Sequence, residues 1–255
     1  MCLILLAWRS HPQHKLLVAA NRDEFYARPT ATAHFWEDAP HILAGRDLEK
    51  GGSWLGVTKN GRFAAVTNVR NMNATTGSLP GELSRGLLVQ NFLDSEKAPA
   101  DFLQALQSSL HHYSPFNLLV SDGNQLYYGN SQGECRELQP GVYGLSNAAL
   151  DTPWPKVIDG KQKLFDLMCS ETKPDHLFDV LADRQQAQDS ELPDTGIDPI
   201  LEKYLSARFI QLDGYGTRCS TVVMQTYAGE IVFQEKQFDQ YGLETHNYST
   251  RINTP

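Results

Sequence analysis

Cys2 stands second in the chain, where removal of the initiator Met1 would make it the N-terminal residue. A thiol on the N-terminal residue has the α-amine beside it, a general base with a pKa of about 7.7 to 8.0. Such a cysteine needs no separate histidine to become a nucleophile. The alternative is that Cys2 is a small hydrophobic residue opening a buried strand, and position alone favours this structural role.

A polar tetrad comes directly after the apolar run at residues 16–20, and it reads Asn21-Arg22-Asp23-Glu24. If residues 3–8 and 16–20 pair as a hairpin, the tetrad lies beside Cys2. An aspartate there can accept hydrogen bonds from the α-ammonium, and an arginine favours thiolate over thiol. The alternative is a cluster of surface ion pairs.

Three further polar residues lie at the ends of predicted strands. Asn68 follows the run at 62–67, Asn147 follows the run at 142–145, and Arg218 precedes the run at 221–226. A side-chain amide can donate to a developing oxyanion, and loss of such a donor typically costs about a hundredfold or more in rate. An arginine can hold a carboxylate or support the charge of a nucleophile. Asparagines at strand ends are also common turn formers.

Metal and cofactor motifs are absent from the sequence. The eight histidines do not resolve into a metal site, since no carboxylate or cysteine at metal-ligand spacing accompanies His11 and His14, which could share a short-loop face. Gly214 and Gly216 complete neither glycine-rich phosphate pattern. We therefore predict neither a metal nor a cofactor.

Short β-rich runs dominate both ends of the chain, and helical patterns are grouped between them. Strands are predicted at 3–8, 16–20, 54–58, 62–67, 116–120, 125–128, 142–145, 221–226 and 230–234. Helices are predicted from Ser84 to Leu93, from a cap at Asp101 through Phe102, Leu106 and Leu110, at 156–169 with Val157, Ile158, Leu164, Phe165 and Met168 on one face, at 177–181 and at 200–205. Residues 185–199 are predicted to be a surface loop. This grouping predicts an α+β fold rather than a doubly wound sheet.

Composition limits the class of protein. The 255 residues are 41% hydrophobic and 20% charged, which is typical of a globular chain, and we expect one domain over 1–255. A net charge of −8 argues against a nucleic-acid partner. The apolar start at 2–8 is too short to span a bilayer, so we expect no integral membrane segment and no targeting signal. Four cysteines without C-x-x-C pairs favour a reducing compartment, and we expect a cytoplasmic protein. No signal for an oligomeric state is present.

Taken together, these motifs closely resemble those of the NRDE-motif family, also called the transport and Golgi organization protein family. The resemblance covers nearly the whole chain and rests on several stretches in order. They are Met1-Cys2, residues 19–26 with Arg28-Pro29, Gly51-Gly52-Ser53-Trp54-Leu55-Gly56, Thr67-Asn68, residues 143–147, Thr152-Pro153-Trp154 and Gly214-Tyr215-Gly216-Thr217-Arg218.

The resemblance implies the fold of N-terminal nucleophile hydrolases, a four-layer αββα sandwich with two stacked antiparallel sheets. The family is similar in layout to the cysteine branch of these hydrolases, which comprises the bile salt hydrolases and penicillin V acylases. It implies that Cys2 is the nucleophile and that Asp23 binds the α-amine. It further implies that Asn68 is an oxyanion donor, that Asn147 positions the substrate or intermediate, and that Arg218 supports the nucleophile.

This chain departs from those hydrolases in the spacing of the arginine and aspartate of this motif. In the hydrolases two residues separate them, whereas in this chain they are adjacent. Adjacent Arg22 and Asp23 point to opposite faces of a continuous strand. We therefore expect Asp23 in the pocket and Arg22 in an ion pair behind the sheet, although Arg22 stays a candidate substrate-binding residue.

Two functions follow from these residues. The first is an amide hydrolase for a small-molecule substrate, in which Trp36, Trp54 and Tyr215 would form an apolar acyl pocket. The second is a non-catalytic carrier of a hydrophobic ligand such as haem or an acyl thioester (acyl-CoA). Cysteine can itself ligate haem iron, so Cys2 alone does not separate the two.

Overall fold

Two stacked antiparallel sheets form the centre of the molecule in a computed structural model, which describes residues 2–70, 82–169 and 171–254. Over these residues the first sheet has the strand order β10-β1-β2-β12-β13-β14, and β11 pairs with β12. Its strands are β1 (Cys2–Trp8), β2 (His14–Phe25), β10 (Gly141–Leu145), β11 (Gln211–Leu212), β12 (Tyr215–Thr226), β13 (Glu230–Phe238) and β14 (Glu244–Asn253). The first sheet thus joins the two ends of the chain through the β2–β12 pairing.

The second sheet runs in chain order from β3 to β9. Its strands are β3 (Thr30–Phe35), β4 (Ile42–Asp47), β5 (Leu55–Thr58), β6 (Phe63–Asn68), β7 (Phe116–Ser121), β8 (Leu126–Asn130) and β9 (Cys135–Glu137). Each strand pairs with the next one along the chain, which is the meander that successive hairpins produce.

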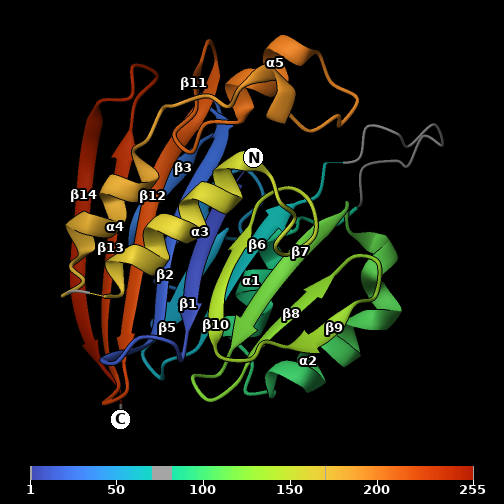
Figure 1. Ribbon diagram of the computed structural model, residues 1–255. Helices are drawn as coiled ribbons and strands as arrows, with labels where there is room; N and C mark the ends of the chain where they lie inside the picture. Colours follow the sequence, from blue (N-terminus) through green and yellow to red (C-terminus); the bar gives the residue numbers. More distant parts are fainter. Residues whose placement is uncertain (1, 71–81, 170, 255) are drawn as a thin grey trace.

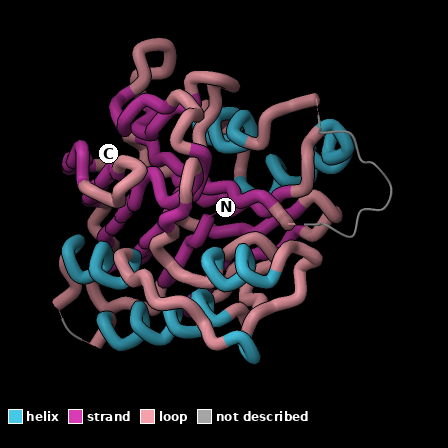
Figure 2. The backbone as a smooth tube through the Cα atoms, turned by 90° about the horizontal axis from the view of Figure 1, so that it is seen from above, coloured by secondary structure: helices cyan, strands magenta, loops and turns pink. Residues whose placement is uncertain are grey.

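Helices cover the outer face of each sheet, and Figure 2 shows them on opposite sides of the strands. The helices over the second sheet are α1 (Gly86–Leu93), α2 (Pro99–Leu106) and η1 (Gln107–His112). Those that follow are α3 (Pro155–Leu167), α4 (Pro174–Leu181), η2 (Asp189–Glu191) and α5 (Pro199–Leu205). Of these, α3 and α4 pack on the first sheet. The α+β class and the two stacked antiparallel sheets are therefore as predicted.

The side chains of β1 point alternately to the two faces of the first sheet and show how the sequence builds these layers. Ile4 and Leu6 pack into the core between the sheets, whereas Leu3 and Leu5 pack beneath α3 and α4. Both faces of β1 are buried, so it reads as a continuous apolar run. The same alternation fixes the direction of each polar side chain at the end of the strand.

Several predicted boundaries need correction. The second strand does not end at Ala20 but continues through the polar tetrad to Phe25, because it pairs with β1 and β12. Asp101 does not cap α2, which begins at Pro99, where the fixed φ of proline suits the first helical position. Ile158 and Phe165 are exposed rather than on the buried face of α3.

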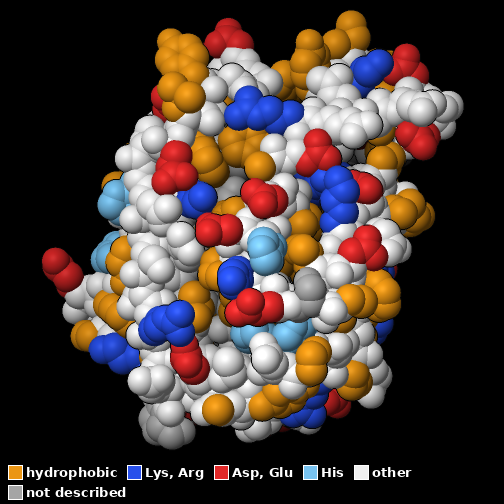
Figure 3. All heavy atoms as spheres, turned by 60° about the vertical axis from the view of Figure 1, so that its left-hand side comes forward, with side chains coloured by type: hydrophobic (Ala, Val, Ile, Leu, Met, Phe, Trp, Pro, Cys, Tyr) orange, Lys and Arg blue, Asp and Glu red, His pale blue; other side chains and the backbone are white. Residues whose placement is uncertain are grey.

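Strands β3, β4, β9, β11 and β14 were not predicted, and β14 shows why. Its buried side chain is Ile252, while most of its other residues are polar and exposed, so it has no apolar repeat. Figure 3 brings this edge of the molecule forward, and acidic and basic side chains are interspersed over it. Charged side chains on an edge strand discourage pairing with another chain.

Across the described residues, none of the helices has both the length and the apolar character that a membrane crossing requires.

Candidate functional site

Cys2 is the first residue of β1 and lies on the face that is turned toward the second sheet. Its register partner on β2 is Arg22, and its backbone carbonyl accepts a hydrogen bond from Ser146 Oγ at 3.0 Å. Burial raises the pKa of the Cys2 thiol, and the backbone N–H of Asp23 and the Arg22 guanidinium act against that rise. Met1, whose removal would free the α-amine, lies outside the described residues.

Arg22 corrects one sequence-based expectation. As predicted, it lies on the face of β2 opposite to Asp23, but both residues line the cavity at Cys2. Because β1 begins at Cys2, opposite Arg22, the rim of the sheet lies here and side chains from both faces border the cavity. The Arg22 guanidinium stacks on the Trp54 ring, 4.3 Å from its centroid, and its nearest described carboxylate, on Glu24, is 4.0 Å away. It is therefore not in an ion pair behind the sheet.

Asp23 is 2% exposed and sits among buried polar groups. Its Oδ1 accepts a hydrogen bond from Thr217 Oγ1 at 2.7 Å, and its backbone carbonyl accepts one from the Tyr215 hydroxyl at 3.0 Å. Burial raises the pKa of the Asp23 carboxyl, while the positive charge of Lys156 and the Thr217 hydrogen bond oppose the rise. Tyr215 thus holds the backbone at the position that the resemblance assigns to amine binding.

Lys156 is a buried cation that the sequence analysis did not single out. It is 4% exposed in the first turn of α3, and its Nζ donates to the Leu205 carbonyl at 3.0 Å. Burial lowers the pKa of Lys156 to about 8, although Asp23 and Cys2 act in the opposite direction. A lysine within a helical pattern gave no chemical signal, because its proximity to Asp23 exists only after α3 packs on the first sheet.

Asn68 and Asn147 meet at the end of β6. Asn147 is fully buried, and its Nδ2 donates to both the backbone carbonyl and Oδ1 of Asn68, at 2.9 and 2.8 Å. With Oδ1 occupied in this way, the Nδ2 of Asn68 is the amide atom left to donate. Asn68 lines the cavity, whereas Asn147 lies behind it. Asn147 therefore holds the Asn68 side chain in place and is outside the described lining of the cavity.

Trp36 and Arg218 lie elsewhere than predicted. Trp36 is 1% exposed in the core beneath α1, with its Nε1 donating to the Ala44 carbonyl, so it cannot line an acyl pocket with Trp54. Arg218 donates to the backbone carbonyls of Phe25 and Arg28 at 2.8 and 3.0 Å. It holds the turn after β2 and is outside the described lining of the cavity. A register shift between β2 and β12 falls at this residue.

The cavity at Cys2 has a volume of about 550 Å³. Its described lining combines the predicted residues with charged residues of three loops. Around Cys2 these residues are Arg22, Asp23, Glu24, Arg28, Asp47, Lys50, Trp54, Asn68, Glu82, Arg85 and Tyr215. Charge of both signs therefore borders the cavity.

Arg85 reaches this cavity because the backbone at Gly52-Ser53 passes close to the backbone at Gly86. Ser53 N–H donates to the Gly86 carbonyl at 3.1 Å, and a Cβ on Gly52 would lie 2.3 Å from the Gly86 carbonyl carbon. Only glycine at position 52 permits that approach. This approach places Arg85, just before α1, beside Trp54 at the cavity wall, and nothing in the local sequence predicts it.

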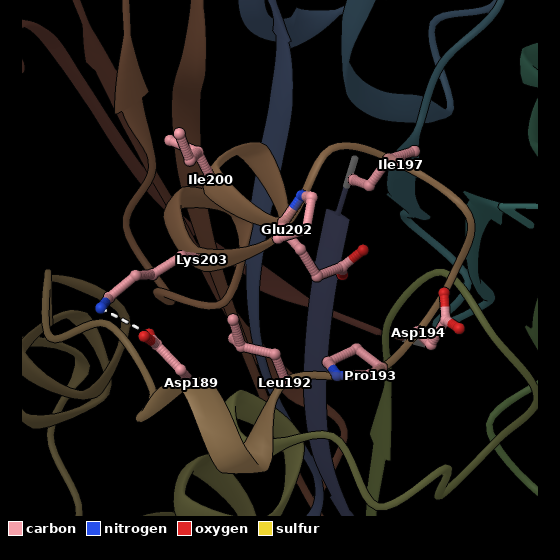
Figure 4. A pocket seen from close by; sticks show the side chains of 9 residues that line it. Asp189, Leu192, Pro193, Asp194, Ile197, Ile200, Glu202 and Lys203 are labelled. Carbon is pink, nitrogen blue, oxygen red and sulfur yellow. Dashed lines mark hydrogen bonds and ion pairs between the residues drawn. The ribbon is translucent and has the colours of Figure 1, made fainter.

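A second hollow of about 440 Å³ lies between η2 and α5. Figure 4 shows its lining, where Lys203 Nζ and Asp189 Oδ1 pair at one edge, 2.6 Å apart. None of the site residues predicted from the sequence lines it. Over the described residues, no group of three or more histidine, cysteine, aspartate or glutamate side chains is arranged so that it could hold a metal ion.

The comparison with protein families finds one match over most of the chain. The model of the family described as Transport and Golgi organisation 2 matches residues 1–240. The Transport and Golgi organization 2 homolog of Mus musculus is 36% identical over 97% of this chain and 98% of its own length. Transport and Golgi organization protein 2 of Drosophila melanogaster is 28% identical over 96% of this chain and 94% of its own.

Solved structures share the fold at low sequence identity. The Caenorhabditis elegans ortholog of N-acylethanolamine-hydrolyzing acid amidase has a TM-score of 0.53 at 12% identity, over 87% of this chain and 92% of its own. The C2A mutant of conjugated bile acid hydrolase from Clostridium perfringens has a TM-score of 0.53 at 8% identity, over 99% of this chain and 93% of its own. The fold is thus that of N-terminal nucleophile hydrolases.

Proposed function

Since this chain belongs to the Transport and Golgi organisation 2 family and has the N-terminal nucleophile hydrolase fold, we propose that it hydrolyses the linear amide bond of a small acyl-amide. Cys2 is the nucleophile after Met1 is removed. The observation that carries the proposal is the arrangement at the cavity, where the Cys2 residue and an Asn68 amide oriented by Asn147 line one space. The two fold neighbours are named for amide-bond and conjugated-bile-acid hydrolysis, which supports the same reaction class.

The first half of the reaction forms a thioester. The α-amine of Cys2 takes the thiol proton, the sulfur attacks the carbonyl carbon, and a sulfur–carbon bond forms. Asn68 Nδ2 donates to the tetrahedral oxyanion. The carbon–nitrogen bond then breaks, and the α-ammonium gives its proton to the leaving amine.

The second half of the reaction releases the acyl group. Water attacks the thioester with the α-amine as base, the carbon–sulfur bond breaks, and the acid leaves while the thiol regains a proton. Asp23, which Thr217 and Tyr215 hold in place, accepts hydrogen bonds from the amine in both halves. Since all four cysteines are free, we place this reaction in the reducing cytoplasm.

A carrier of a hydrophobic metabolite is the alternative function. The charged lining of the cavity favours the hydrolase, because arginine, lysine and carboxylate side chains border the space that an apolar ligand would fill.

The decisive experiment starts with the intact mass of the purified protein, which shows whether Met1 has been removed. Processed wild-type protein should release amines from a panel of small acyl-amides, and Cys2→Ala should remove this turnover while the circular dichroism spectrum and melting curve are retained. Cys169→Ala, at an exposed free cysteine, is the matched control and should keep full activity. Unchanged turnover in Cys2→Ala, or retention of Met1, would overturn the mechanism.

A further inference from the structure

Arg85 carries a positive charge into the wall of the Cys2 cavity without a carboxylate partner in the described structure. Its guanidinium makes one described hydrogen bond, from Nη1 to the Pro115 carbonyl at 3.2 Å. Arg85 and Cys2 line the same cavity, and a Cys2 thiolate would interact favourably with the guanidinium. A guanidinium has five N–H donors, so most of its donors are left for a ligand.

The carboxylates of the cavity wall are engaged with other groups. Among the described residues, none forms an ion pair with Arg85. Asp47 accepts from Arg28 at 2.7 and 2.9 Å, Asp23 from Thr217 at 2.7 Å, Glu24 from the Phe25 N–H at 2.9 Å, and Glu82 lies 3.6 Å from His112. The segment 71–81, which precedes this region in the chain, contains no aspartate or glutamate.

Two other donors line the same wall. Arg22 is 6% exposed, and its guanidinium lies over the Trp54 ring, with one described hydrogen bond, to Thr30 Oγ1 at 3.2 Å. Trp54 is 9% exposed, and its buried Nε1 has no acceptor among the described residues. A buried donor without an acceptor costs free energy unless a ligand supplies one.

We propose that the Cys2 cavity selects acyl-amides that carry a carboxylate, and that Arg85 is the residue that recognises this group, with Arg22 as the second cation. This inference rests on the proposed function and names its substrate class. Arginine pairs with a carboxylate through two parallel N–H···O bonds, which fixes both position and orientation. The neighbouring carboxylates of Glu24 and Asp47 would repel a doubly charged phosphate, so the site suits a single negative charge.

The test uses a matched pair of substrates, N-octanoylglycine and N-octanoylglycinamide, which differ only in the carboxylate. Processed wild-type protein should hydrolyse the acid with a kcat/KM at least tenfold above that of the amide. Arg85→Gln should bring the two values to within about twofold, mainly by raising KM for the acid. Arg85→Lys should restore part of the preference because it restores the charge.

Arg136→Gln is the control for the loss of an arginine, because Arg136 is exposed and pairs with Glu134 away from the cavity. It should keep the wild-type preference for the acid. Equal kcat/KM for the two substrates in wild-type protein would overturn the inference. An equal loss for both substrates in Arg85→Gln would also overturn it, since Arg85 would then act on the thiol or the fold.

Titration calorimetry of both compounds with wild-type protein separates this inference from the proposed function. If the acid binds without turnover and Arg85→Gln weakens this binding at least tenfold, the hydrolase proposal is wrong and carboxylate recognition is supported. If the protein turns over both compounds without preference for the acid, the hydrolase proposal is supported and carboxylate recognition is wrong. If the acid is neither bound nor hydrolysed, carboxylate recognition by Arg85 is wrong.

Discussion

Two groups of charged residues near Cys2 differ in how their charges are paired. At the cavity, Arg85 forms no ion pair among the described residues, and the Arg22 guanidinium lies 4.0 Å from its nearest described carboxylate, on Glu24. Beyond the end of β6, Arg70 forms a buried ion pair with Glu202 of α5 at 2.6 Å, and Lys156 at the start of α3 is buried and interacts electrostatically with Asp23. Charges that are paired and buried hold elements together, whereas cations left without a partner at a cavity are available to a ligand.

The largest effect is expected from breaking the buried pair. Arg70→Met leaves Glu202, which is 5% exposed, without its cationic partner, and should lower the free energy of unfolding by about 3 to 5 kcal/mol. The double variant Arg70→Met/Glu202→Leu should recover most of this loss, because neither charge then remains buried. Urea unfolding measures both. A single variant as stable as wild type would mean that the pair contributes nothing to the fold.

Next in size is the effect expected at Asn68, the proposed oxyanion donor in the cavity. Asn68→Ala should lower kcat by about 100- to 1000-fold with a small change in KM, because the donor acts mainly in the transition state. Asn147→Ala should lower kcat less, since it acts through the orientation of Asn68. Steady-state kinetics on the hydrolysed substrate distinguishes the two. A kcat within threefold of wild type in Asn68→Ala would assign oxyanion stabilisation to another group.

Lys156 makes the free energy of unfolding depend on pH. Its folded pKa of about 8 lies below the unfolded value of about 10.4, so the unfolded chain binds more protons between these values. The contribution of Lys156 to stability should therefore rise as pH increases from 8 to 10, by at most about 1.4 kcal/mol per pH unit. Unfolding of wild type and Lys156→Met at pH 7, 8, 9 and 10 isolates this contribution. A difference between them that stays constant with pH would contradict the depressed pKa.

The smallest stability effect is expected at Arg85. Arg85→Gln removes one hydrogen bond to a backbone carbonyl and breaks no described ion pair, so the free energy of unfolding should change by less than about 0.5 kcal/mol. A thermal melt beside that of Arg70→Met makes the comparison direct. A loss as large as that of Arg70→Met would mean that the cavity cation is structural.

Much of the architecture could be predicted from local patterns. The hairpins at β5–β6, β7–β8 and β12–β13 follow from a turn residue between short β-rich runs, which is a local property of the backbone. The position of Cys2 behind Met1 and of Asn68 at the end of a strand could also be read directly. Both residues lie where the sequence placed them, at the rim of a sheet.

The contents of the cavity depended on the tertiary structure. Trp36 and Trp54 are both buried tryptophans, but they lie on opposite faces of the second sheet, and only Trp54 lines the cavity. Arg218 holds a turn, whereas Arg85 enters the cavity because Gly52 lets the start of α1 approach. The sequence by itself determined the strands of these three hairpins, their turns and the position of Cys2 at the start of a strand, because these depend on neighbours along the chain. Which charged side chains face Cys2 was decided by how the sheets and helices pack, because that packing joins residues far apart in the sequence.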